Sequence, residues 1–257
     1  MNIFAQLFKS LYSPNDIARF RFQGIGKTIL YVFFLTFISV LPMTYHFIND
    51  FVEGIKNTGE LLKSELPEFT IENGELSSSA DKPVIIDKSG FRIVFDSTGQ
   101  TTKEDVERYT NAIGFLKHEI VLVANSETQY YDYAMFQNMK LTDKDVHSFI
   151  ETLQSLMPVI IPVTFVILYI FASASKFIGI TFLAFIGLII RGTLGKNIKY
   201  RHTWIMSAYA VTLSTIFFTI MESLQVVVPY ALAIHWFVSV TVLFLAIKEI
   251  PSPKLAE

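Results

Sequence analysis

The sequence predicts an α-helical integral membrane protein of about five transmembrane helices, with a small extracytoplasmic α+β domain inserted between the first and second spans. The chain has 257 residues, 51% of them hydrophobic, and its mean hydropathy of +0.43 exceeds that of ordinary soluble domains. Its middle section is acidic instead, since residues 49–153 hold 19 acidic and 10 basic side chains. A bilayer therefore suits the two ends of the chain, and water suits the middle.

Residues 1–27 are predicted to form a cytoplasmic amphipathic segment, and residues 28–48 the first transmembrane helix. The segment carries four basic side chains and one acid, and positive flanks stay in the cytoplasm. The apolar run that follows has about the length of a bilayer crossing and no small-residue cleavage site, so we expect an uncleaved anchor. Apolar residues at helical spacing and the start signal Ser13-Pro14 predict two short helices at the membrane surface within the segment.

Residues 49–154 are predicted to form the extracytoplasmic α+β domain. Short β-rich runs divided by the turn signals Asn73-Gly74 and Ser89-Gly90 indicate a small antiparallel sheet. The expected strands cover residues 69–71, 83–86, 91–95, 120–123 and 130–135.

Two capping-box patterns predict helices in the same domain. One begins at Thr102 and predicts a helix over residues 103–116, and the other begins at Thr142 and predicts a helix over residues 143–156. The second helix leads directly into apolar sequence, so we expect it to run on into the membrane.

Residues 155–247 are predicted to form a transmembrane helical bundle. The apolar stretch 156–190 would make a helix of about 50 Å, which is longer than a hydrocarbon layer of about 30 Å. We therefore predict a break at residues 173–176, which places Lys176 at an interface, where a charged side chain costs less than in the bilayer centre. Two spans result from this stretch.

Two further spans, at residues 204–221 and 226–247, bring the total to five and put a C-terminal tail, residues 248–257, outside. The segment 191–202 holds four basic residues and no acid, yet five spans place it outside as well. Because basic loops stay in the cytoplasm, a four-span alternative with one broken or tilted crossing remains open.

Two motif-like stretches have structural interpretations. Residues 24–28 resemble the end of a phosphate-binding loop but lack its first glycine and a preceding strand, so we interpret them as the basic flank of a span. Residues 96–99, Asp-Ser-Thr-Gly, differ in spacing from an aspartic protease signature and have no second copy, so they indicate a turn after a strand. The absence of cysteine excludes thiolate metal sites and catalytic cysteines.

Three ionisable residues inside or beside the spans are the candidate site residues: Glu222, His235 and Lys176. His235 falls near the centre of the last predicted span, where an ionisable side chain often marks a pathway or relay. Glu222 could be its partner, but 13 residues of continuous helix would separate the two by about 20 Å. The alternative interpretation of His235 is a hydrogen bond to a neighbouring helix.

Three segments resemble a known family. These are the residues SLYSP at 10–14 before the first span, FTIENGEL at 69–76, and the stretch 200–213 with its SAYAVTL ending. In this order they resemble a Firmicutes membrane family, domain of unknown function 1189, some members of which are labelled maltodextrin-utilisation proteins. The stretch 200–213 is also similar to the Yip-type five-span superfamily, although Ser214 stands near that pattern's proline. The resemblance implies a topology and no catalytic residues.

The sequence therefore predicts a non-enzymatic plasma-membrane protein of a Gram-positive bacterium. We expect the exported domain to bind a partner protein or an envelope ligand, and the bundle to contact lipid and another membrane protein. The alternative is a transport component or an accessory to a sugar (maltodextrin) permease. No cofactor, metal site or nucleic-acid partner is expected, because the five histidines are far apart in sequence and the net charge is only -2.

Overall fold

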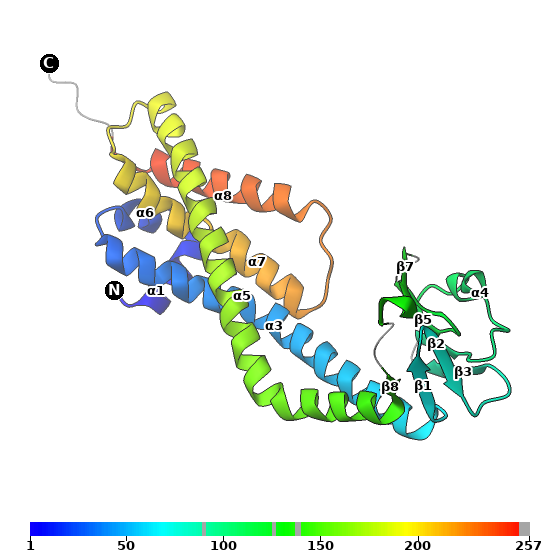
Figure 1. Cartoon of the computed structure of the whole chain (residues 1–257). Coiled ribbons are helices and arrows are strands. Elements are labelled where there is room, and N and C mark those ends of the chain that lie inside the picture. The colour runs from blue at the N-terminus through cyan, green and yellow to red at the C-terminus, as the bar shows by residue number, and fades with distance from the viewer. Residues whose placement is uncertain (89–90, 125–126, 137–139, 252–257) are drawn as a thin grey trace, which may run out of the picture. The chain divides into compact units, whose positions relative to one another are not determined.

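The computed structural model describes residues 1–88, 91–124, 127–136 and 140–251. The chain divides into two compact units. The helical unit comprises Met1–Asn49 and Ile160–Glu257, and the β unit comprises Asp50–Val159 (Figure 1). The helices α3 (Ile25–Ser64) and α5 (Asp143–Thr193) contribute residues to both.

The helical unit also holds five shorter helices. These are α1 (Ile3–Tyr12), α2 (Pro14–Phe20), α6 (Tyr200–Ala210), α7 (Thr212–Ser223) and α8 (Ala231–Lys248). Among the described residues, four helical stretches are long and apolar enough to cross a membrane: Ile25–Asn57, Asp143–Thr193, Tyr200–Ser223 and Ala231–Lys248. The chain is thus a helical protein suited to a membrane, and α6 and α7 together supply one of its four candidate spans.

The break predicted at residues 173–176 is wrong, because α5 is helical throughout from Asp143 to Thr193. The stretch Ser173-Ala174-Ser175 holds neither glycine nor proline, and small residues of this kind are tolerated in helices that pack closely. The fifth crossing depended on this break. Within the described residues there is therefore one long helix where we had expected two spans.

The two short helices expected near the N-terminus are present as α1 and α2. Asn2 Oδ1 accepts a hydrogen bond from the Ala5 backbone N–H at 2.8 Å, and Ser13 Oγ accepts one from the Asp16 N–H at 3.2 Å. One face of the pair is buried in the bundle core, with Ile17 fully buried. The amphipathic pattern predicted the helices but could not show that their inner faces pack on protein, since lipid and protein select the same apolar side chains.

The β unit contains two sheets. The first has the order β2-β1-β8, formed by β1 (Phe69–Glu72), β2 (Glu75–Ser78) and β8 (Leu141–Thr142). The second has the order β3-β4-β5-β6-β7, formed by β3 (Val84–Lys88), β4 (Phe91–Phe95), β5 (Ala112–Phe115), β6 (Glu119–Ala124) and β7 (Glu127–Asp132). Strands β4 and β5 pair in parallel and the strands form two sheets, so the prediction of one antiparallel sheet is wrong.

The turn expected at Asn73-Gly74 joins β1 to β2, with positive φ angles of 55° and 81° at these two residues. Such angles at both central positions are the requirement of a type I′ hairpin turn, which asparagine and glycine meet with least strain. The other expected turn, Ser89-Gly90, lies outside the described residues.

Both predicted capping boxes are present, but only one of the two helices that they begin covers all the predicted residues. Thr102 and Asp105 start α4 (Lys103–Glu107), which ends well before residue 116 because Ala112–Phe115 form β5. Strand β5 lies between β4 and β6, and the hydrogen bonds on its two sides override the local helical preference. The other box, at Thr142, begins α5 at Asp143 as predicted.

Gly114 allows α4 to pack closely against β5. A Cβ atom at this position would lie 2.8 Å from Val106 Cγ2 and 3.2 Å from Cγ1, and Val106 is fully buried. We expect Gly114→Ala to lower the free energy of unfolding of the β unit by about 1–3 kcal/mol through overpacking. The measurement is the urea midpoint of the full chain in detergent, read by pulse proteolysis of the β unit.

The matched control is Gly54→Ala in α3, where nothing lies within 4 Å of the added methyl group. Alanine is the better helix former, so this variant should keep or raise the midpoint. A Gly114→Ala midpoint equal to that of the wild type would contradict the close packing of Val106.

Candidate functional site: polar cavities in the helical unit

Helices α7 and α8 bring Glu222 and His235 to a common cavity. Helix α7 ends at Ser223 and α8 begins at Ala231, so a loop separates the two residues. The expected separation by 13 residues of continuous helix is therefore wrong. The position expected for His235, near the centre of a span, is also wrong, because His235 is the fifth residue of the 18-residue helix α8. The sequence had suggested a span from residue 226, and the helix starts later because Tyr230 adopts a left-handed conformation, with φ at 56°.

Lys176 lies in the interior of α5, because the helix break that was expected at residues 173–176 is absent. Its Nζ donates a hydrogen bond to Thr215 Oγ1 in α7 at 3.0 Å. At 1.5 Å per residue, about 26 Å of helix separates Lys176 from the end of α5 at Thr193. This amine therefore has a polar partner within the bundle, which the sequence did not show.

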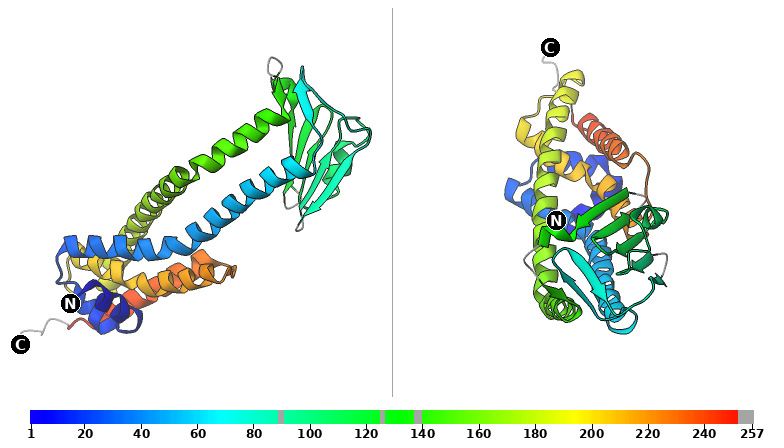
Figure 2. Two further views of the ribbon diagram at one scale, coloured as in Figure 1. Left: turned by 90° about the horizontal axis from the view of Figure 1, so that it is seen from below. Right: turned by 45° about the vertical axis from the view of Figure 1, so that its right-hand side comes forward.

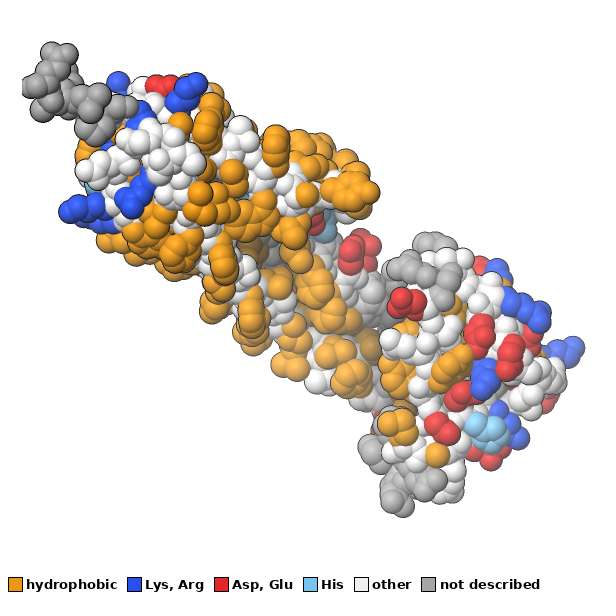
Figure 3. Space-filling view, turned by 90° about the horizontal axis from the view of Figure 1, so that it is seen from above, with side chains coloured by type: hydrophobic (Ala, Val, Ile, Leu, Met, Phe, Trp, Pro, Cys, Tyr) orange, Lys and Arg blue, Asp and Glu red, His pale blue; other side chains and the backbone are white. Residues whose placement is uncertain are grey.

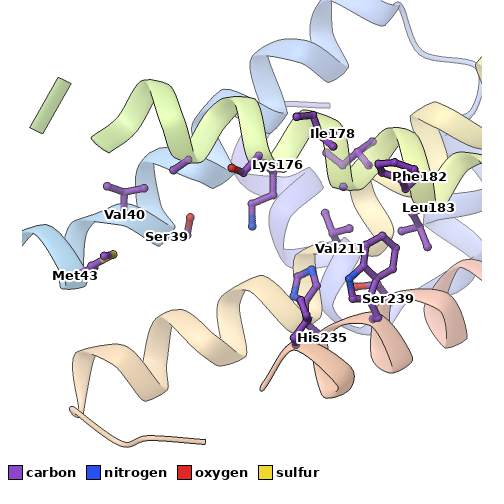
Figure 4. A pocket seen from close by; sticks show the side chains of 16 residues that line it. Ser39, Val40, Met43, Lys176, Ile178, Phe182, Leu183, Val211, His235 and Ser239 are labelled. Carbon is purple, nitrogen blue, oxygen red and sulfur yellow. The ribbon is translucent and has the colours of Figure 1, made fainter. Parts of the chain in front are cut away.

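Two adjoining cavities contain all three candidate residues. The larger, which we call the α5–α8 cavity, has a volume of about 590 Å³, and the smaller, which we call the Glu222 cavity, has about 350 Å³. Lys176 and His235 line both, and Glu222 lines only the smaller one. Figure 4 shows Lys176 on α5 and His235 on α8 pointing toward one another across the α5–α8 cavity.

Hydroxyl groups that the sequence analysis did not single out complete the polar lining. Ser39 from α3 lines both cavities, and Thr215 and Ser239 line one each. Ser239 Oγ lies 2.9 Å from Ser214 Oγ, which links α7 to α8. Small polar residues scattered through the spans were the available signal, and only the packing shows which of them share a cavity.

Lys176 forms no ion pair with any residue that the structure describes. In the part of the chain that the structure describes, no carboxylate lies within ion-pair distance of its Nζ. Glu222 is exposed at the end of α7, and the ring of His235 has Phe218 as an aromatic neighbour at 6.2 Å. The α5–α8 cavity therefore presents an amine, an imidazole and serine hydroxyls in a mainly apolar wall, and the Glu222 cavity has a carboxylate beside the same amine and imidazole.

Basic side chains gather at the opposite end of the helical unit. Lys27 Nζ donates to the Met1 carbonyl at 2.6 Å, Arg201 donates to the Gln23 carbonyl at 3.5 Å, and Lys196 donates to the Ile250 carbonyl. Figures 1 and 2 show the N-terminal helices, the start of α6 and the end of α8 together at this end. On the face seen in Figure 3, Lys and Arg side chains gather there while hydrophobic side chains cover most of the rest of the unit.

A second polar cluster lies in the core of the helical unit, near this basic end. Tyr209 OH is 3.2 Å from Gln6 Oε1 and 3.3 Å from Gln23 Oε1, and Gln6 Nε2 donates to Gln23 at 2.9 Å. Tyr31 and Thr212 hydroxyls lie 2.6 Å apart beside it. Every member has a partner in this closed network, so we assign it a structural role.

The two motif-like stretches have the structural roles that we had predicted. Gly24 directly precedes α3, residues 25–28 form the start of that helix, and no strand comes before them. Asp96 follows β4 and accepts hydrogen bonds from the Thr98 N–H, the Thr98 hydroxyl and the Thr101 N–H, as expected of a turn residue. Among the described residues, no group of three or more His, Asp or Glu side chains could hold a metal ion.

Comparison with known proteins identifies a family and no individual relative. No curated protein and no solved structure matches the chain. The family model with the description "Protein of unknown function (DUF1189)" matches residues 4–247, which include the helical unit almost entirely and the whole β unit. The chain therefore belongs to the DUF1189 family.

Proposed function

We propose that this chain is a non-enzymatic, multi-pass protein of the plasma membrane of a Gram-positive bacterium. Its helical unit anchors it in the bilayer, and its β unit lies outside the cytoplasm and binds a partner protein or an envelope ligand. The observation that carries the proposal is the exposed aromatic edge strand β7.

Strand β7 stands at one edge of the five-stranded sheet and pairs only with β6 within the described residues. Tyr130 and Tyr131 point to opposite faces of it and are 48% and 44% exposed. Met135, just after the strand, is 75% exposed. An edge strand offers backbone hydrogen bonds to an added strand, and exposed tyrosine and methionine are enriched where proteins bind each other.

Crosslinking of the full chain in its native membrane tests this proposal. We expect a photoreactive residue in place of Gln129 to capture a defined partner, and Tyr131→Lys to reduce that capture about tenfold, since a lysine on an edge strand opposes strand addition. Ile85→Lys on β3, the opposite edge of the same sheet, is the matched control, because Ile85 is 55% exposed. Capture that is at background level, or that survives Tyr131→Lys, would refute binding at β7.

Four spans with the basic end in the cytoplasm are part of the proposal. Basic flanks stay inside, so both ends of the helical unit's chain and the segment 194–199 would be cytoplasmic, and the loop 224–230 would be outside. This arrangement removes the conflict that five spans created for the basic residues 191–202. It also places the C-terminus inside, in contrast to the sequence-based expectation.

Single-cysteine labelling of intact cells is the decisive measurement, because the chain has no native cysteine. An impermeant maleimide should label Val227→Cys and Ser79→Cys without permeabilisation, and Asn197→Cys only after it. Val227 is 92% exposed, and Ser79 and Asn197 are exposed as well. Ala256, a further informative position, lies outside the described residues. Labelling of Asn197→Cys in sealed cells would restore the five-span topology.

The second candidate function is a transport component or an accessory to a sugar (maltodextrin) permease. It is favoured by the convergence of Lys176, Glu222 and His235 on adjoining cavities, since transport needs polar groups along a route through the bundle. Solute uptake by a deletion strain carrying the wild-type or the His235→Ala chain tests it. Uptake that is the same in all strains would exclude this function.

A further inference from the structure

The lining of the α5–α8 cavity is more apolar than a sugar site requires. Of its 16 residues, the clearly polar ones are two that titrate, Lys176 and His235, and three serines, Ser39, Ser175 and Ser239. A sugar presents hydroxyl groups on every side, and burying them against hydrocarbon without partners is costly. A wall of this composition suits an acyl chain that carries one anionic group.

The mouth of this cavity opens through the apolar surface of the helical unit. Four of the lining residues, Met43, Ile178, Phe182 and Leu232, are more than half exposed, at 54%, 58%, 60% and 74%. In a bilayer, exposed apolar side chains of candidate spans face lipid tails. A lipid chain can therefore enter the cavity sideways without crossing water.

The charge of Lys176 indicates which polar group the ligand carries beside its acyl chain. Lys176 is partly buried on an apolar helix, and its Nζ bonds a threonine hydroxyl and no described carboxylate. An ammonium group in a span normally pairs with an anion, because leaving it unpaired in a low dielectric is costly. His235, which points at Lys176 across the cavity, adds a second nitrogen for the same anion (Figure 4).

The depth of these nitrogens matches a lipid headgroup. Thr215, the partner of Lys176, lies about 12 Å of helix before the end of α7 at Ser223, and His235 lies about 6 Å after the start of α8. Both therefore lie in the half of the bundle that the loop 224–230 closes, within reach of a headgroup at that end. We propose that the α5–α8 cavity is a binding site for an anionic phospholipid, with Lys176 on its phosphate and the apolar wall on one acyl chain.

Native mass spectrometry of the full chain in detergent tests this site. The probes are phosphatidylglycerol and phosphatidylcholine with identical acyl chains. We expect the wild type to prefer phosphatidylglycerol about tenfold, Lys176→Gln to lose that preference, and Lys176→Arg to keep it. Lys248→Gln, at the exposed end of α8, is the matched control and should bind like the wild type.

A second variant tests the binding of the acyl chain and leaves Lys176 unchanged. Gly179 lines the cavity, and nothing lies within 4 Å of a Cβ added there, so Gly179→Leu fills the space without a clash at its Cβ. We expect it to weaken phosphatidylglycerol binding about tenfold, while Gly192→Leu, equally open on the same helix, leaves binding unchanged. Tryptophan fluorescence melts confirm that each variant is folded.

Three results would overturn the site: equal binding of the two lipids, wild-type phosphatidylglycerol affinity in Lys176→Gln, or wild-type affinity in Gly179→Leu. Displacement of the lipid by an equal concentration of soluble glycerol phosphate would also overturn it, by showing that the acyl chain contributes nothing. The site is separate from partner binding by the β unit, so Tyr131→Lys should bind lipid normally whether or not it loses a partner.

Discussion

Tyr209→Ala is expected to destabilise the helical unit by about 3 kcal/mol, the largest effect expected of a substitution in that unit. Tyr209 is fully buried, with its ring 4.7 Å from Phe20 and 4.3 Å from Tyr31. Truncation leaves a cavity among these rings and removes the hydroxyl that bonds Gln6 and Gln23. Within a membrane bundle, the loss of packing contacts and of hydrogen bonds accounts for the cost, since lipid is as apolar as the core.

Tryptophan fluorescence during thermal unfolding in detergent measures this effect on the helical unit alone. The chain has two tryptophans, Trp204 and Trp236, and both belong to that unit. Tyr209→Phe keeps the ring and should cost about 1 kcal/mol, the worth of a hydrogen-bonded hydroxyl. Tyr12→Ala, at a position that is 74% exposed, is the matched control. If Tyr209→Ala melted within a degree of Tyr12→Ala, the packing of α2 and α3 on α6 would be in error.

Asp96→Ala is expected to destabilise the β unit by about 3 kcal/mol. Asp96 is 1% exposed and accepts hydrogen bonds from Thr98 and Thr101, including two backbone N–H groups. Alanine leaves these donors buried without an acceptor, which costs about 1–3 kcal/mol for each group that water cannot reach. Pulse proteolysis across a urea series gives the midpoint. Asp96→Asn keeps one acceptor oxygen and should therefore lose less stability than Asp96→Ala. The control is Asp87→Ala, at an exposed residue of β3, which should lower the midpoint much less.

The same carboxylate makes the stability of the β unit depend on pH. Burial alone would raise the pKa of Asp96, but hydrogen bonds from Thr98 and Thr101 outweigh burial and hold the pKa below its ordinary value. A carboxyl whose folded-state pKa is depressed contributes its full stability above its unfolded-state pKa of about 3.9 and loses it as the pH falls through the folded-state value. The wild-type midpoint should therefore fall below about pH 4, and the gap between wild type and Asp96→Asn should narrow. A gap that is constant from pH 7 to pH 2.5 would show that the charge of Asp96 contributes nothing.

Local signals in the sequence predicted most of the helices and the ends of several elements. The first apolar run, the caps at Ser13, Thr102 and Thr142, and the Asn73-Gly74 turn each depend on residues within one turn or hairpin of each other. The interactions that stabilise these elements are made between residues close together in the chain, so a single sequence suffices to identify them.

Elements whose partners are distant in the chain were mispredicted. Strand β5 was expected to be helix, because its stabilising neighbours β4 and β6 do not show in its own residues. The length of α5 was misjudged for a related reason. The cost of Lys176 inside a span depends on Thr215, 39 residues further on, and the sequence does not show that the two meet.

The sequence by itself determined that this is a helical protein suited to a membrane, with an acidic, strand-containing insertion and three ionisable residues near its spans. Only the tertiary structure decided that α5 is one helix, that α1 and α2 enter the bundle core, and that Glu222 and His235 share a cavity with Lys176. The physical reason is that hydrophobicity and capping act over a few residues. The environment of a buried polar group, by contrast, is supplied by other helices, and no local sequence pattern predicts which helices pack around it.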